Sequence, residues 1–272
     1  FAELTLEGFT LSTTGSNDRG IDIRNATATL NNVYISGFSR NREGAAIRIR
    51  DGATVTISDS NFDANESEDD GGHIYVSGST LTISNSDITD GWAEDGGGIY
   101  ATNSTLILTG VTLDGNAVSN TGGSLVLDES TADIDSSDFY AAEASGGYAG
   151  HIYCNESTLN IANTNVEFGV VETMGGGIYA SDSDLVVENT TFYDNESNGA
   201  GGWWTSGGSG GALAVVDGTL SMKGSIFSAN SATESGGGIY AEGSDVSIST
   251  TSLTQNEAFG AGGWWSSGGR GG

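Results

Sequence analysis

The amino-acid sequence predicts an all-β chain that winds as a parallel β-helix. The hexapeptide Gly-Gly-Gly-Ile-Tyr-Ala occurs at residues 96–101, 175–180 and 236–241, and looser copies of it recur every 25 to 27 residues. Apolar residues keep their places within each copy, because Ile99 is followed seven residues later by Leu106, then by Leu113, and three residues further by Asn116. A short unit repeated at a constant period is the signature of a solenoid, here of about ten coils in 272 residues.

Within each coil the pattern predicts three short strands. Apolar and polar residues alternate over about four positions, as in Leu106-Ile107-Leu108, and Gly, Asn, Asp or Ser interrupt the alternation. Alternation of this length between turn residues is typical of strands. The connections are too short for crossover helices, so equivalent strands of successive coils are expected to pair in parallel at about 4.8 Å, which gives a rod of roughly 50 Å.

The repeat also predicts columns of identical residues inside the rod. An asparagine column is expected to hydrogen-bond along the axis through stacked amides; its members are Asn65, Asn116, Asn195, Asn230 and Asn256. Cys154 falls in a column of alanines and is expected to be a buried, unreactive thiol. His73 and His151 hold equivalent positions three coils apart, roughly 14 Å, so they are not expected to share a metal ion.

Residues 1–272 are predicted to form a single β-solenoid with two insertions. Residues 196–210 and 257–272 are rich in glycine and carry the pairs Trp203-Trp204 and Trp264-Trp265. The first coil lacks its first strand and the last insertion stops where another coil would start. We therefore expect the sequence to be a segment of a longer repetitive chain, since solenoids normally carry caps.

Composition narrows the classes of partner. The net charge of −28 argues against nucleic acid and anionic membranes as partners. No stretch approaches the roughly 18 apolar residues of a membrane helix, so no membrane insertion is expected within the sequence. The single cysteine excludes an intramolecular disulfide. An acidic, lysine-poor surface suits a salty or extracellular setting.

Short motifs connect the repeat to a known class of surface protein. Gly-Gly-x-Ile is followed by Phe-x-x-Asn at residues 62–65, 192–195 and 227–230. These motifs resemble the repeats of chlamydial polymorphic outer-membrane proteins and of related right-handed parallel β-helix surface proteins. The resemblance covers nearly the whole sequence and implies a secreted or surface-displayed protein used for adhesion or assembly.

Two sets of aromatic residues are candidates for partner contact. Trp203, Trp204, Trp264 and Trp265 lie in the glycine-rich insertions and are expected either to contact a partner or to cover the chain's own sheet; sugar stacking is a weaker alternative. A tyrosine column follows the inward isoleucines and is expected to face outward as a lateral docking surface or as simple cross-strand stacking. Its members are Tyr75, Tyr100, Tyr153, Tyr179 and Tyr240.

Acidic and glycosylation sites are weaker candidates. Carboxylates that could hold Ca²⁺ are Glu66, Glu68, Asp69, Asp70, Asp90, Asp95, Asp133, Asp135 and Asp138. Solvated acidic turns are the preferred interpretation, because none of them matches a calcium motif; no cofactor is predicted. Sequons place candidate N-glycans at Asn25, Asn103, Asn155 and Asn189.

The sequence does not predict an enzyme. Parallel β-helices also include pectate lyases and polygalacturonases, but residues 51–222 contain no Lys or Arg to hold an acidic sugar. We expect an extracellular structural protein that forms or decorates a surface fibre through lateral and axial self-association. The alternative is an adhesin passenger domain that binds host or environmental glycans. A carbohydrate-active enzyme, or an ice-binding protein based on paired threonines such as Thr54 and Thr56, is less favoured.

Overall fold

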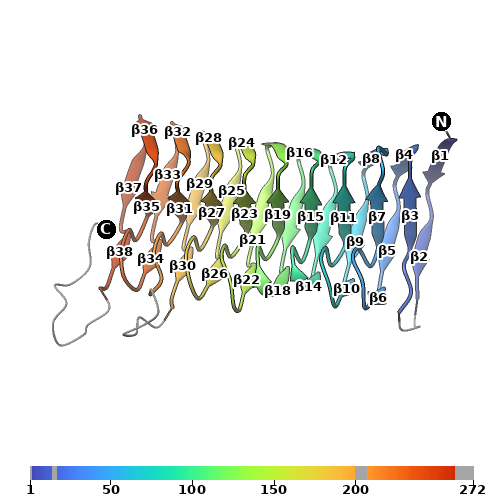
Figure 1. The fold of residues 1–272 in the computed structure, drawn as a ribbon, viewed down its shortest axis with the longest axis horizontal. Helices are drawn as coiled ribbons and strands as arrows, with labels where there is room; N and C mark the ends of the chain where they lie inside the picture. The colour runs from blue at the N-terminus through green and yellow to red at the C-terminus, as the bar shows by residue number, and fades with distance from the viewer. Residues whose placement is uncertain (1, 14–16, 200–206, 261–272) are drawn as a thin grey trace.

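The coils stack along one axis to form a rod. The computed structural model describes residues 2–13, 17–199 and 207–260. All regular elements in these ranges are β-strands, and they follow one another around successive coils from one end of the rod to the other (Figure 1). In this part of the chain no helix has the length and hydropathy needed to span a lipid bilayer.

Four parallel sheets run the length of the rod, and we number them in the order in which a coil visits them. Sheet 1 carries the strand that follows the glycines of each coil. Its members, in spatial order, are β3 (Ile21–Arg24), β7 (Ile47–Arg50), β11 (Ile74–Ser77), β15 (Ile99–Thr102), β19 (Leu125–Asp128), β23 (Ile152–Asn155), β27 (Ile178–Ser181), β31 (Leu213–Val216) and β35 (Ile239–Glu242).

Sheet 2 contains the longest strands. They are β1 (Ala2–Glu7), β4 (Ala26–Asn31), β8 (Thr54–Ser58), β12 (Thr80–Ser84), β16 (Thr105–Thr109), β20 (Thr131–Asp135), β24 (Thr158–Ala162), β28 (Asp184–Glu188), β32 (Thr219–Lys223) and β36 (Asp245–Ser249). Sheet 3 consists of three-residue strands. They are β2 (Thr10–Ser12), β5 (Tyr34–Ser36), β9 (Asn61–Asp63), β13 (Asp87–Thr89), β17 (Thr112–Asp114), β21 (Asp138–Tyr140), β25 (Asn165–Glu167), β29 (Thr191–Tyr193), β33 (Ile226–Ser228) and β37 (Ser252–Thr254).

Sheet 4 adds a short strand, beyond the three expected from the sequence, to each described coil from β5 onward. Its members are β6 (Ser39–Arg40), β10 (Glu66–Ser67), β14 (Trp92–Asp95), β18 (Ala117–Thr121), β22 (Glu143–Ala144), β26 (Val170–Val171), β30 (Glu196–Ser197), β34 (Ser231–Ala232) and β38 (Glu257–Ala258). Most of these strands have two residues, which is too short for alternation to be visible in the sequence. They are identified by pairing between coils, which a single coil cannot reveal.

The strand register confirms the predicted parallel β-helix. Ile74 pairs with Ile99, Leu81 with Leu106 and Ile88 with Leu113 in sheets 1, 2 and 3. Each pair joins residues that hold the same place in the predicted spacing. The rod therefore has the constant register that a solenoid requires.

The corners between strands combine a left-handed residue with a buried serine. Asn103, for example, has φ 50° and precedes Ser104. Asn tolerates this conformation better than most residues. The Ser104 amide donates to the hydroxyl of Ser130 in the next coil at 3.0 Å, and the Ser104 hydroxyl donates to the Thr102 carbonyl at 2.7 Å. These serines, which the sequence suggested only as strand breakers, form a hydrogen-bonded ladder along the rod.

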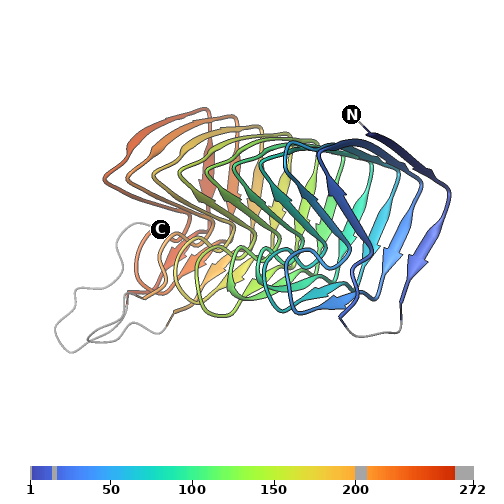
Figure 2. The ribbon, with the colours of Figure 1, turned by 45° about the vertical axis from the view of Figure 1, so that its right-hand side comes forward.

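The rod encloses a large core along its length and, in four successive coils, a smaller one. The large core lies between sheets 1, 2 and 3 and includes a face-to-face pair, Phe192 and Phe227, at 4.4 Å between ring centroids. A separate cluster of Ala93, Val118, Ala144 and Val171 fills the part of the coil bounded by sheet 4. Figure 2 shows this part as a narrow loop attached to a wider one, repeated along the rod.

Candidate functional site

The tyrosines of sheet 1 form one column on the outer side of the sheet, as predicted. Cross-strand pairing puts Arg48, Tyr75, Tyr100 and Val126 in line. Tyr153, Tyr179, Ala214 and Tyr240 continue the same line. Tyr75 and Tyr100 stack with centroids 5.5 Å apart, and Tyr153 and Tyr179 stack at 5.6 Å. Stacking between parallel strands accounts for both pairs.

The column is more covered than alternation alone suggests. Tyr179 is only 7% exposed, and Tyr148 from the preceding connection stacks on it at 4.4 Å. The cover is a glycine-rich segment that returns against the strand. A Cβ on Gly175 (φ 75°) would lie 2.9 Å from the Cβ of Tyr179, so only glycine permits this approach. Each tyrosine of the column is therefore at least half-buried.

Val126 interrupts the column and leaves a pocket. The pocket has a volume of about 240 Å³ and is lined by Asp95, Tyr100, Asn120, Thr121, Val126, Asp128, Tyr153 and Asn155. Val126 is 3% exposed although it points outward, because the tyrosines of the neighbouring coils flank it. A valine in place of a tyrosine thus creates a cavity with an aromatic wall on either side and carboxylates at its rim.

Carboxylates follow the edge of the tyrosine column. Glu43, Asp70 and Asp95 each lie five residues before the column residue of their coil. Burial, followed by the nearby charge of Asp95, raises the pKa of Asp70 from 3.8 to about 7. Burial also raises the pKa of Asp95. Burial raises the pKa of the Tyr153 hydroxyl to about 12, with further contributions from Tyr179 and Asp128. The face is strongly negative and partly shielded from water.

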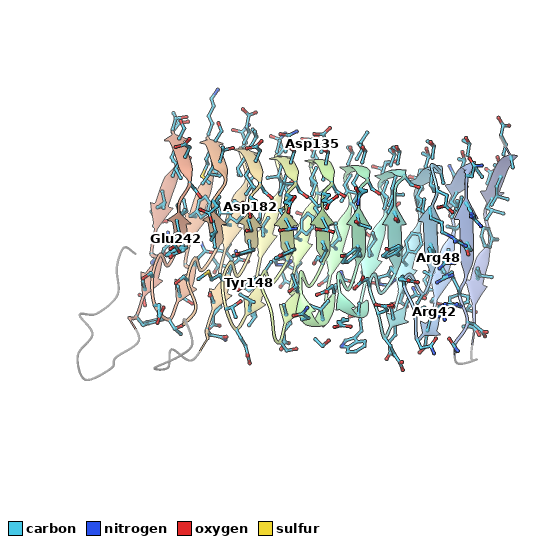
Figure 3. All side chains as sticks on the ribbon, in the orientation of Figure 1. Arg42, Arg48, Asp135, Tyr148, Asp182 and Glu242 are labelled. Atoms are coloured by element: carbon cyan, nitrogen blue, oxygen red, sulfur yellow. The ribbon has the colours of Figure 1, made fainter. Side chains whose placement is uncertain are left out.

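Among the described residues, the arginines that compensate this charge lie in the N-terminal coils. Arg48 occupies the column position next to Tyr75, and its Nη2 lies 2.7 Å from Oδ2 of Asp22. Its Nη1 lies 3.5 Å from Oε2 of Glu43. Arg48 is drawn near the N-terminal end of the rod in Figure 3, where Glu242 marks the other end of sheet 1. Four of the basic residues in the first fifty positions thus form local ion pairs; they are Arg19, Arg24, Arg48 and Arg50.

The two histidines are buried in the interior and complete the asparagine column. Nδ1 of His73 lies 2.8 Å from Nδ2 of Asn65, and Nε2 of His151 lies 2.8 Å from the Glu167 carbonyl. Burial lowers the pKa of both imidazoles to about 4. Further along the rod the predicted amide ladder is present, with Nδ2 of Asn195 donating to Asn230 at 2.9 Å and that of Asn230 donating to Asn256 at 2.8 Å. Cys154 is fully buried, and burial raises the pKa of its thiol.

Three of the acidic residues considered as calcium ligands are paired with asparagines. Asp133, Asp135 and Asp138 each accept a hydrogen bond of 2.7 Å from an asparagine of the next coil; these donors are Asn160, Asn163 and Asn165. Within the described ranges, no group of three or more His, Cys, Asp or Glu side chains is arranged to hold a metal ion. The pairing of Asp with Asn across coils was missed because it depends on which turn residues align between coils.

The candidate glycosylation sites differ in accessibility. Asn25, Asn103 and Asn189 are exposed and have φ between 47° and 50° at corners of the coil. Asn155 is half-buried at the pocket rim, and its Nδ2 donates to Oδ1 of Asp128 at 2.9 Å. A glycan on Asn155 would use the same nitrogen, so Asn25, Asn103 and Asn189 are the more accessible acceptors.

The tryptophan pairs lie outside the described residues, while other aromatic residues are visible on the surface. Trp203, Trp204, Trp264 and Trp265 fall in residues 200–206 and 261–272. Trp92 of sheet 4 is 39% exposed. A second aromatic row, not noticed in the sequence, joins Tyr140 to Phe168 at 5.0 Å and Phe168 to Tyr193 at 5.5 Å. Its signal was weak because Phe168 lies in a turn, outside the alternating pattern.

Comparison with known protein families agrees with this architecture. A family model described as the right-handed beta helix region matches residues 3–139, just over half of the 272 residues. No curated protein matches the sequence. The matched coils have the same register and sheet order as the unmatched ones. The chain therefore belongs to the right-handed β-helix family.

Proposed function

We propose that this chain is an extracellular structural β-helix that forms or decorates a surface fibre. Right-handed β-helix regions are often found in secreted or surface-displayed proteins. The repeats also resemble those of chlamydial polymorphic outer-membrane proteins, which favours the cell surface. The observation that carries the proposal is the tyrosine face: a column of stacked aromatic rings in constant register, edged by carboxylates, repeated at the spacing of the coils.

A repetitive face of this kind suits lateral association. Two rods that lie side by side can repeat the same contact at the coils that carry a tyrosine, so weak contacts add along the interface. The aromatic row formed by Tyr140, Phe168 and Tyr193, in which the two tyrosines are exposed, gives a second face with the same spacing. The predicted contacts of Trp203, Trp204, Trp264 and Trp265 belong to this proposal. Neither face needs a cofactor or a metal ion.

The second candidate is an adhesin passenger domain that binds glycans. The observation on its side is the pocket over Val126, where Tyr100 and Tyr153 offer aromatic rings on which part of a sugar can stack. In both proposals the protein is not an enzyme. Among the described residues the histidines are buried with lowered pKa values, and the one cysteine is buried with a raised pKa, so none is a ready nucleophile or base.

Electron microscopy and sedimentation of the protein isolated from its source test the structural proposal. Filaments or lateral arrays with an axial repeat of about 4.8 Å are expected from stacked coils. The double substitution Trp203→Ala with Trp204→Ala should weaken assembly and leave the β-rich circular dichroism unchanged. Trp92→Ala is the matched control, since Trp92 is exposed but lies outside the insertions.

Two results would contradict the structural proposal. If the rods stay dispersed at all concentrations, self-association is contradicted. If Trp92→Ala weakens assembly as much as the double substitution does, a specific role of the insertions is contradicted. Retention of a single glycan by dispersed rods would instead support the adhesin.

A further inference from the structure

The gap in the tyrosine column has the dimensions of a slot for one planar group. Tyr100 and Tyr153 belong to strands β15 and β23, which are separated by β19. Adjacent rings elsewhere in the column are 5.5 and 5.6 Å apart. Two strand spacings therefore separate Tyr100 from Tyr153 by roughly 10 Å. A planar group placed midway over Val126 would lie within about 6 Å of both ring centroids, which is the range for cation–π contact.

The rim of the slot favours a positive charge. Asp95 and Asp128 lie on it, and none of the eight lining side chains is basic. Oδ1 of Asp95 accepts the Thr121 amide at 2.8 Å, and Oδ1 of Asp128 accepts the Asn155 amide at 2.9 Å. Each carboxylate keeps further lone pairs for a ligand. The charge of both carboxylates raises the pKa values of Tyr100 and Tyr153, in addition to burial, so both carboxylates lie near both rings.

The chain cannot supply a cation to this slot from the neighbouring coils. Residues 51–222 contain no Lys or Arg. A neutral ligand would leave the two carboxylates at the rim uncompensated, and excluding water from them would be costly. A planar cation would both neutralise the charge of the carboxylates and stack on the two tyrosine rings.

The same column already holds one arginine in this environment. Arg48 stands at the position equivalent to Val126, beside Tyr75, with carboxylates of Asp22 and Glu43 at 2.7 and 3.5 Å. Glu43 corresponds to Asp95, because each lies five residues before the column residue of its own coil. The N-terminal coils thus place a guanidinium against two carboxylates on this face, at the strand position next to a tyrosine.

We propose that the pocket between Tyr100 and Tyr153 binds the guanidinium group of an arginine side chain from another polypeptide. Its planar, permanently charged fork matches two aromatic faces and two carboxylates. The pocket of about 240 Å³ is smaller than typical small-molecule pockets, which start at about 300 Å³, and suits a single side chain. This proposal concerns a site on one rod and does not require that rods assemble.

Binding of N-acetyl-arginine methylamide to dispersed protein, followed by NMR of the tyrosine rings, tests the site. Signals of Tyr100 and Tyr153 should shift while those of Tyr240 do not. Asp128→Asn should weaken binding by about fivefold, as expected for the loss of one partly exposed ion pair. Glu242→Gln is the matched control, since Glu242 holds the same strand position as Asp128 four coils away.

Filling the slot gives a second, independent variant. Val126→Tyr introduces the residue found at the equivalent position of the coils before and after it, so the fold should be retained. Circular dichroism and the thermal midpoint should stay near those of the wild type, and arginine binding should be lost. Unchanged arginine binding in Val126→Tyr would overturn the proposed site.

Comparison of several probe compounds identifies the chemical class of ligand that the pocket binds. N-acetyl-lysine methylamide should bind more weakly than the arginine compound, because an ammonium group is neither planar nor bidentate. Equal binding of the two would overturn guanidinium selectivity. Binding of a methyl glycoside, lost in Val126→Tyr, without binding of arginine would assign the slot to a sugar and overturn the proposal.

A third measurement distinguishes the source of the arginine. If a second copy of this chain supplies it, concentration-dependent association of the wild type should be inhibited by N-acetyl-arginine methylamide and lost in Val126→Tyr. If the arginine compound binds but neither this compound nor Val126→Tyr alters association, the arginine is assigned to a different protein. Failure of the Trp203/Trp204 test above leaves the binding measurement unaffected, so the two proposals fail separately.

Discussion

The imidazole of His73 fills the space that a side chain at Gly91 would need. A Cβ built on Gly91 would lie 2.5 Å from Nε2 of His73. His151 and Gly169 have the same relationship, with Cδ2 of His151 2.5 Å from such a Cβ. In three other coils a glycine stands where the histidine is and an asparagine where the second glycine is, as with Gly98 and Asn116. A histidine and a glycine thus replace a glycine and an asparagine within a coil.

This exchange predicts that Gly91→Asn is destabilising although asparagine is the commoner residue of that column. The new side chain would meet the His73 ring and the Gly97 carbonyl. Overpacking of this kind costs about 1–3 kcal/mol, to be measured by urea denaturation. Gly78→Asn is the control, because Gly78 has open space around it and φ 55°, a conformation that Asn103 already adopts at the equivalent corner. A cost as small as that of the control would contradict the relationship.

Acidification should destabilise the fold through the two histidines. Their pKa is lowered from 6.5 to about 4 by burial. Below pH 6.5 the unfolded chain therefore binds protons that the folded chain does not bind until near pH 4. The contribution of the histidines to the free energy of unfolding is thus complete above pH 6.5 and is lost as the pH falls. Each histidine contributes about 3 kcal/mol across that interval.

Unfolding free energies at pH 4.5, 5.5 and 7 measure this effect. His73→Gln should remove about half of the decrease in unfolding free energy between pH 7 and pH 4.5, whatever its effect on stability at pH 7. NMR titration of the imidazole in the wild type is an independent readout. A titration midpoint near 6.5 in the folded protein would contradict the prediction.

Asp70 should act in the opposite direction. Burial and the neighbouring carboxylates raise its pKa from 3.8 to about 7, so the folded chain holds a proton that the unfolded chain releases above pH 3.8. Its contribution is present below that value and is lost as the pH rises through 7. Asp70→Asn should therefore raise the thermal midpoint at pH 8 and change it little at pH 4. Asp182→Asn, at an exposed corner, is the control. A lower midpoint at pH 8 would show that the Asp70 carboxylate is stabilising.

The Asp–Asn hydrogen bonds between neighbouring coils predict that one added negative charge among them will destabilise the fold. Asn160→Asp would replace the amide that donates to Oδ1 of Asp133 at 2.7 Å with a second carboxylate. Like charges opposite one another on neighbouring strands are destabilising by about 0.2–1 kcal/mol. Denaturation at pH 7 in low salt should show the loss, and 1 M NaCl should reduce it. A loss that does not change with salt would indicate that charge is not its cause.

Much of the fold could be predicted because it follows from a short repeat in the sequence. The spacing from Ile99 to Leu106 to Leu113 fixes which residues face inward, and a parallel solenoid is the arrangement in which equivalent short strands can pair. The same alternation placed Tyr75 and Tyr100 on the outer face. The strands of sheet 4 could not be predicted, because two residues show no alternation.

The candidate site depended on information that no single coil contains. Val126 is an ordinary strand residue in the sequence, and it marks a pocket only because Tyr100 and Tyr153 flank it in the stack. Asp133 becomes a hydrogen-bond acceptor because Asn160, 27 residues later, is its neighbour. In the sequence these residues are separated by a whole coil.

By itself, the sequence determined the period, the inward and outward faces and the absence of basic residues over residues 51–222. Those properties are local or compositional. The tertiary structure decided which outward side chains touch, where the glycine-rich segments cover the tyrosines, and where His73 takes the place of an asparagine. The physical reason is that stacking brings residues 25 to 27 positions apart to roughly 5 Å, so the chemistry of each site is set by the neighbouring coils.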